Sequence, residues 1–118
     1  VLVAYDGSPS AMRAVDHIAR SPVYAGLDVS VVTFGQDAEA ARRKLSDAQS
    51  TLAGGGFDAT TEIRPGNPDT ALGELLAEGR HDHVVMGSSG HTRFRAFFVG
   101  STTMEMLRAS PVPILLVK

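Results

Sequence analysis

The stretch VLVAYDGSPSAMRAV, residues 1–15, predicts a strand followed directly by a helix, and the same alternation of strand and helix decides the fold of the chain. Residues 1–5 are apolar and rich in β-branched side chains, which predicts a buried strand that ends at an Asp-Gly pair. Ser8 and Pro9 follow, a favoured N-cap and a favoured first helical residue. Apolar residues then recur at helical spacing, so the strand is followed directly by an amphipathic helix.

Predicted strands and helices alternate along the rest of the chain, without an internal sequence repeat. Further strands are predicted over residues 28–34, 59–64, 83–87 and 113–117, and further helices start at Asp37, at Asn67-Pro68 and after Gly100. Short apolar strands joined by helical crossovers predict a parallel sheet with helices on both faces. We therefore expect one doubly wound α/β domain over residues 1–118, with five strands and four helices.

The composition excludes several classes of function. The chain of 118 residues has 11 Lys and Arg against 13 Asp and Glu, and this net charge of −2 argues against a nucleic-acid binder. Cysteine is absent, which excludes disulfides and a thiol nucleophile. No apolar run has the length of a membrane span and no signal peptide opens the sequence, so we expect a cytoplasmic protein without a membrane partner.

The chemistry is expected after the fourth predicted strand, in MGSSGHTRFRAFFVGSTT, residues 86–103. In open parallel sheets, ligands bind at the carboxyl ends of the strands, where the strand order reverses. Residues 87–90 can turn backbone N–H groups inward as an anion nest, and residues 100–102 open a helix whose free N–H groups suit a phosphate. From the residues alone, the alternative is a connection with a glycine turn and an ordinary helix cap.

This stretch contains neither a GxxxxGK[ST] loop nor a GxGxxG dinucleotide fingerprint. A phosphate site here must therefore depend on main-chain donors and hydroxyl groups, with help from Arg93 or Arg95. His81 and His83 stand two residues apart without a clear third ligand, so no metal site is predicted from side chains alone.

The spacing Gly87-x2-Gly90-x9-Gly100-Ser101 resembles the ATP-binding signature of the universal stress protein family, G-x2-G-x9-G-[S/T]. The two ends of the chain are also similar to that family's first strand and helix and to its last helix and strand. The resemblance implies a five-stranded parallel sheet in the order 3-2-1-4-5, an adenine nucleotide alpha hydrolase-like fold. It also implies a dimer that binds ATP, ADP or AMP together with Mg²⁺.

The resemblance assigns individual residues to the nucleotide. Asp6, with Gly7 beside it, is expected at the ribose or the adenine, and Phe34 replaces a small aliphatic adenine contact of the family. Met86 and Gly87 are expected to line the adenine and ribose side. The residues expected at the phosphates are Gly90, Arg93, Gly100, Ser101 and Thr102.

The last predicted strand, residues 113–117, indicates a partner. At the edge of the sheet it would expose unpaired backbone groups, which pairing with the same strand of a second chain or of a tandem domain would cover. The expected function is an ATP-binding regulatory module of the stress response that acts as a dimer, with no catalytic residues and at most slow ATP hydrolysis. A nucleotide-free dimeric interaction module and a weak ATPase are the alternatives.

Overall fold

The computed structural model describes residues 1–87 and 112–117, and the helix predicted after Gly100 lies outside them. Its parallel sheet has the strand order β3-β2-β1-β4-β5, which confirms the predicted order. The strands are β1 (Leu2–Ala4), β2 (Ser30–Phe34), β3 (Thr60–Arg64), β4 (Val84–Gly87) and β5 (Ile114–Val117). The described helices are α1 (Pro9–Arg20), η1 (Pro22–Tyr24), α2 (Glu39–Gly54) and α3 (Pro68–Ala77).

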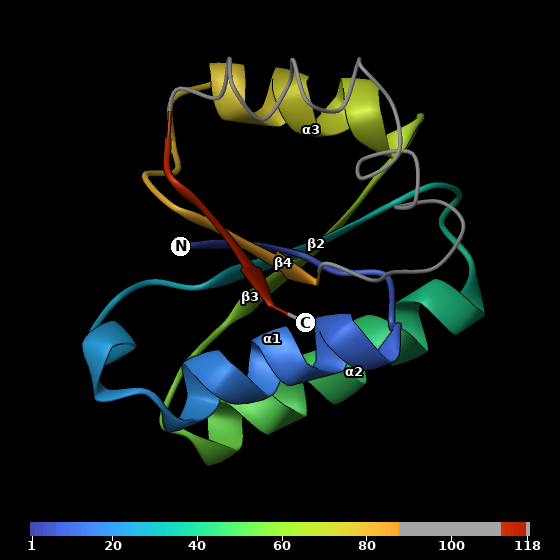
Figure 1. The fold of residues 1–118 in the computed structure, drawn as a ribbon. Coiled ribbons are helices and arrows are strands. Elements are labelled where there is room, and N and C mark those ends of the chain that lie inside the picture. Colours follow the sequence, from blue (N-terminus) through green and yellow to red (C-terminus); the bar gives the residue numbers. More distant parts are fainter. Residues whose placement is uncertain (88–111, 118) are drawn as a thin grey trace.

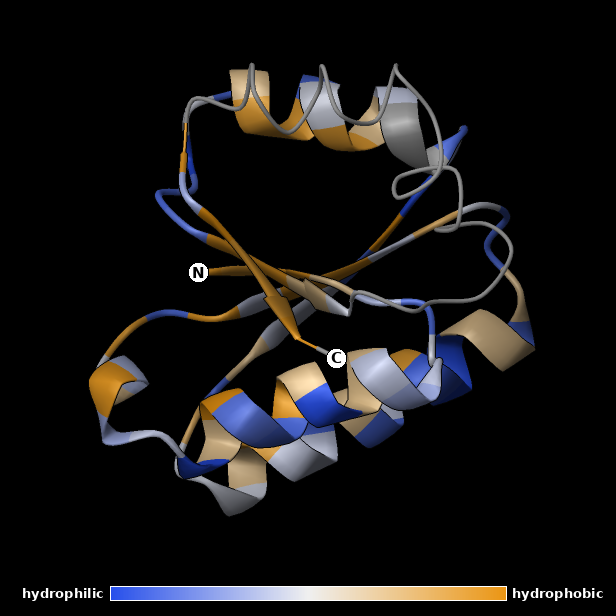
Figure 2. Cartoon of the chain, in the orientation of Figure 1, coloured by the Kyte–Doolittle hydropathy of each residue, from blue (hydrophilic) through white to orange (hydrophobic). Residues whose placement is uncertain are grey.

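Helices α1 and α2 lie on one face of the sheet and α3 lies on the other (Figure 1). Alternate side chains of the central strands fill the two layers between the helices and the sheet. Val3, Val31 and Val85 pack against α1 and α2, whereas Leu2 and Val84 pack against α3. The central strands β1 and β4 are accordingly apolar, while charged residues gather on the outer sides of α1 and α2 (Figure 2).

Helix α1 begins and ends where the sequence predicts. The side-chain oxygen of Ser8 accepts a hydrogen bond from the Ala11 N–H at 3.2 Å, which makes Ser8 the N-cap, and Pro9 is the first helical residue. At the other end, the Ser21 N–H donates to the His17 carbonyl at 3.0 Å. Ser21 also caps the one-turn helix η1, which the sequence analysis did not predict.

Helix α2 begins at Glu39, two residues after the predicted start, so that prediction is wrong in detail. The N-cap position is taken by Ala38, which is extended and has no side-chain oxygen for a capping hydrogen bond. The carboxylate of Asp37 forms an ion pair with Arg42 instead. Aspartate favours the N-cap position, but the side chain of Asp37 forms this ion pair and does not cap α2.

The segment after α3 is held to β3 by charge. The Arg64 guanidinium donates two hydrogen bonds to the Glu78 carboxylate, at 2.6 Å and 3.0 Å, and Arg80 donates to the same carboxylate. The hydrogen bond from Arg64, followed by that from Arg80, lowers the pKa of Glu78 from 4.5 to about 2. The ionised carboxylate of Glu78 thus stabilises the folded state.

We expect the substitution Glu78→Gln to make stability less dependent on pH in acid. A lowered folded-state pKa contributes stability above pH 4.5, and this contribution is lost as the pH falls toward about 2. The free energy of unfolding of the variant should therefore fall below that of the wild type above pH 4.5 and approach it near pH 2, as measured by urea unfolding. Glu74→Gln, on the exposed side of α3, is the control. A difference that does not change with pH would contradict the role of Glu78.

Candidate functional site

The carboxyl edge of the sheet is the candidate site. The chain runs from β1 outward to β2 and β3, and then crosses back to β4 on the other side of β1, so the strand order reverses beside β1. Asp6 follows β1, Gly87 ends β4 and Phe34 ends β2, which brings these residues of three adjacent strands to one edge. This is the place where open α/β sheets bind ligands.

The turn after β1 holds Asp6 in a defined position. Asp6 is 9% exposed as a residue, and its Oδ1 accepts a hydrogen bond from the Ser8 N–H at 2.9 Å. Between them, Gly7 has a φ of +78°, a conformation that side-chain-bearing residues rarely adopt. The same three residues therefore position the carboxylate and cap α1.

Gly87 lies directly against the first turn of α1. A Cβ atom at this position would be 2.4 Å from the Ser10 Oγ and 2.6 Å from the Ala11 nitrogen, far inside contact distance. Ser10 is fully buried, and its hydroxyl is 3.4 Å from that of Ser8. Packing alone therefore requires a glycine at position 87, whatever else this residue does.

Phe34 and Met86 belong to the core. Their exposed fractions are 2% and 1%, and both side chains pack in the layer that contains Leu72 and Leu75 of α3. Phe34 is the largest fully buried side chain among the described residues. A contact of either side chain with a base stays a prediction.

The other predicted nucleotide contacts lie outside the described residues. These are Gly90, Arg93, Gly100, Ser101 and Thr102, and Arg95 lies outside them as well. The predicted phosphate grip between the two glycine segments therefore stays a prediction.

Tyr5 is a feature of the site region that the sequence analysis missed. Tyr5 directly precedes Asp6, and its side chain packs in the layer between the sheet and helices α1 and α2. There it lines a groove of 540 Å³ together with Met12 and Asp47. Burial, and then the negative charges of Asp47 and Asp6, raises the pKa of the Tyr5 hydroxyl. The sequence carries no signal for this position of Tyr5, because an aromatic residue at the end of an apolar run is equally expected from packing in the core.

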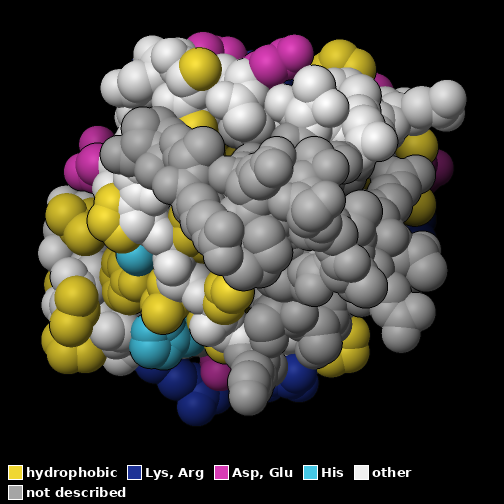
Figure 3. Space-filling view, turned by 45° about the horizontal axis from the view of Figure 1, so that its top comes forward, with side chains coloured by type: hydrophobic (Ala, Val, Ile, Leu, Met, Phe, Trp, Pro, Cys, Tyr) yellow, Lys and Arg dark blue, Asp and Glu magenta, His cyan; other side chains and the backbone are white. Residues whose placement is uncertain are grey.

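The three histidines of the described residues, His17, His81 and His83, lie elsewhere. The Nε2 of His83 is 3.0 Å from the Tyr24 hydroxyl, with the two rings stacked, and the His17 ring meets Tyr24 edge-on. Histidine and hydrophobic side chains accordingly lie together on the surface in Figure 3. Burial lowers the pKa of His81. Within residues 1–87 and 112–117, no three His, Asp or Glu side chains form a cluster that could hold a metal ion.

Comparison with known proteins identifies the family. The family model described as "Universal stress protein family" matches residues 18–118. The chain belongs to the universal stress protein family. None of the helices in the part of this universal stress protein that the structure describes is long and apolar enough to cross a membrane.

The relatives of this universal stress protein differ in length. A universal stress protein of Synechocystis sp. is 35% identical over 98% of this chain, and one of Methanocaldococcus jannaschii is 29% identical over 80% of it. The aligned regions span only 41% and 61% of those two proteins. A solved universal stress protein in complex with cAMP has 27% identity and a TM-score of 0.77, and the match covers 98% of this chain and 93% of that one.

We expect the substitution Gly87→Ala to destabilise the unliganded protein. The new methyl group must displace the first turn of α1, and overpacking of this kind costs about 1–3 kcal/mol. Urea unfolding without nucleotide measures the effect. Gly73→Ala is the control, because nothing lies within 4 Å of a Cβ at that position of α3. That substitution should be neutral or stabilise by up to about 1 kcal/mol. Equal stability of Gly87→Ala and the wild type would contradict the packing role.

Proposed function

We propose that this universal stress protein is a regulatory module that binds ATP at the carboxyl edge of its sheet and acts as a dimer. The observation that carries the proposal is the position of Asp6, just after β1, and of Gly87, at the end of the adjacent β4, at the point where the strand order reverses. The glycine spacing that starts at Gly87 supports a phosphate-binding role for the segment that follows. The solved relative in complex with cAMP supports an adenine nucleotide as the class of ligand.

The chemistry proposed is recognition. The Asp6 carboxylate, oriented by the Ser8 N–H, accepts hydrogen bonds from ribose hydroxyl groups or the adenine amine. Gly7 permits the positive φ of the turn that holds Asp6, and Gly87 permits the close packing of β4 on the first turn of α1, so both glycines shape the edge that the nucleotide approaches. A ligand that binds only the folded state stabilises it, by about 2.7 kcal/mol at a concentration of 100 times its Kd. The free energy of unfolding of the module thereby rises with the concentration of the nucleotide.

A nucleotide-free interaction module is the second candidate. It is favoured by the contact of Gly87 with Ser10, because this contact explains the first glycine of the signature without a ligand. The two candidates differ in what the purified protein carries and binds.

Mass spectrometry of the small molecules released on denaturation tests the nucleotide proposal. We expect ATP or ADP at near-stoichiometric yield, and binding of added ATP with Mg²⁺ in calorimetry. Gly90→Val and Gly100→Val should abolish this binding while circular dichroism shows an unchanged fold. ATP affinity unchanged by both substitutions, or no binding by the wild type, would count against the proposal.

The dimer is proposed to form at β5. This strand ends the strand order, so one of its edges lacks a partner strand within the described sheet, and Leu116 is 40% exposed on it. Pairing of two β5 strands would cover both features.

We expect Leu116→Lys to weaken the dimer at least about tenfold, because a charge replaces an apolar side chain at the proposed interface. Sedimentation velocity over a range of protein concentrations measures the change. Leu27→Lys is the control, since this leucine is 49% exposed and precedes β2, on the other side of β1. A wild-type chain that sediments as a monomer at all concentrations would contradict the proposed interface.

A further inference from the structure

Lys44 of α2 lies across the turn that follows β1. A Cβ atom at Gly7 would be 2.8 Å from the Lys44 Cδ, 3.3 Å from its Cε and 3.4 Å from its Cγ. The hydrocarbon stem of the lysine therefore rests on Gly7, the residue between Asp6 and the helix cap. The contact restricts the rotamers of a long side chain and keeps its stem on the turn that carries Asp6.

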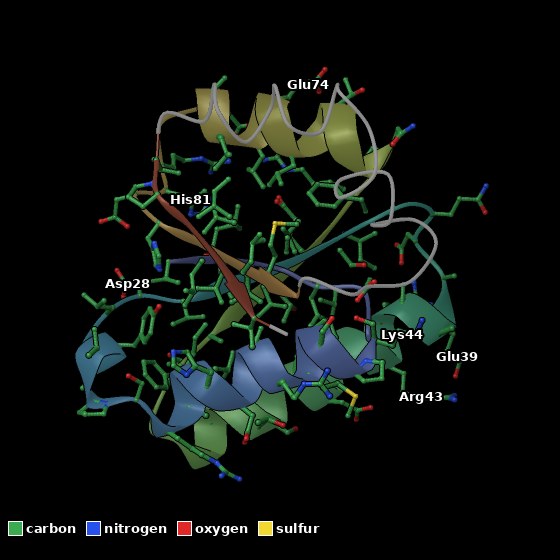
Figure 4. The ribbon with its side chains drawn as sticks, in the orientation of Figure 1. Asp28, Glu39, Arg43, Lys44, Glu74 and His81 are labelled. Carbon is green, nitrogen blue, oxygen red and sulfur yellow. The ribbon has the colours of Figure 1, made fainter. Side chains whose placement is uncertain are left out.

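The position of Lys44 in the molecule agrees with this contact. Figure 4 shows Lys44, Glu39 and Arg43 at the end of the molecule opposite Asp28 and His81. Asp28 and His81 precede β2 and β4, so they mark the amino edge of the sheet. Lys44 therefore lies at the carboxyl edge.

Lys44 differs from most of the described arginines in its surroundings. Five of them form ion pairs: Arg20 with Asp16, Arg42 with Asp37, Arg43 with Glu39, Arg64 with Glu62 and Glu78, and Arg80 with Glu78. Within residues 1–87 and 112–117, Lys44 forms no ion pair, and its side chain is exposed. Its ammonium group is thus available to an anion at this edge.

We propose that Lys44 recognises the phosphate groups of the nucleotide and makes the site prefer ATP over adenosine. The inference rests on the proposed function and adds to it a residue from α2, outside the glycine signature. A lysine ammonium is a compact charge with three donors, which suits a flexible phosphate chain. Because its stem is already held on Gly7, less side-chain entropy is lost when the ammonium binds than for a free lysine.

The substitution Lys44→Met tests the inference, because Met keeps an unbranched stem on Gly7 and removes the charge. Calorimetry at low salt gives the affinities of the wild type and the variant for ATP, AMP and adenosine. We expect ATP to bind about tenfold more weakly to the variant, AMP to be affected less, and adenosine to bind equally well. Lys44→Arg, which keeps the charge, should retain most of the preference for ATP.

Arg43→Met is the matched control. It removes one positive charge from the residue that precedes Lys44 in α2. Because Arg43 is already paired with Glu39, the affinity for ATP should change less than about twofold. Unchanged ATP affinity of Lys44→Met would overturn the inference alone. Equal weakening of ATP and adenosine would also overturn it, since Lys44 would then act by holding the turn. Failure of the wild type to bind any of the three ligands would overturn the proposed function and this inference together.

Discussion

The contact between Gly87 and the first turn of α1 is the constraint on which the carboxyl edge of this universal stress protein depends. It joins the end of β4 to the start of the helix that follows β1, across the point where the strand order reverses. Only a glycine permits it, because a methyl group would overlap the Ser10 hydroxyl and the Ala11 backbone. The position of the α1 N-terminus, and with it the turn that holds Asp6, follows from this contact.

The turn of residues 6–8 combines three functions in a short segment. Ser8 caps α1, its N–H fixes the Asp6 carboxylate, and the positive φ of Gly7 reverses the backbone between them. Lys44 covers the turn from α2. A nucleotide bound here would thus meet a carboxylate already positioned by the turn, which reduces the entropy lost on binding.

Much of the fold could be predicted because strands, helix caps and glycine turns depend on residues that are close together along the chain. Ser8-Pro9 and Ser21-Pro22 gave the ends of α1 correctly, and the apolar runs gave all five strands, whereas the strand order was predicted from the family resemblance. The start of α2 was wrong because Asp37 pairs with Arg42, a side-chain contact that competes with capping. At the site, Asp6 follows β1, Gly87 ends the adjacent β4 and Phe34 ends β2 with its side chain buried, and their contacts with a nucleotide stay predictions.

The amino-acid sequence by itself determined the alternation of strands and helices, the doubly wound topology, and the glycine spacing that resembles the family signature. These depend on residues that are neighbours or stand at a fixed period along the chain. Only the tertiary structure decided that Gly87 packs on Ser10, that Lys44 lies over Gly7, and that Arg64 binds Glu78. Each of these contacts joins side chains or backbone from different elements, and how those elements approach each other is set by the packing of the whole domain.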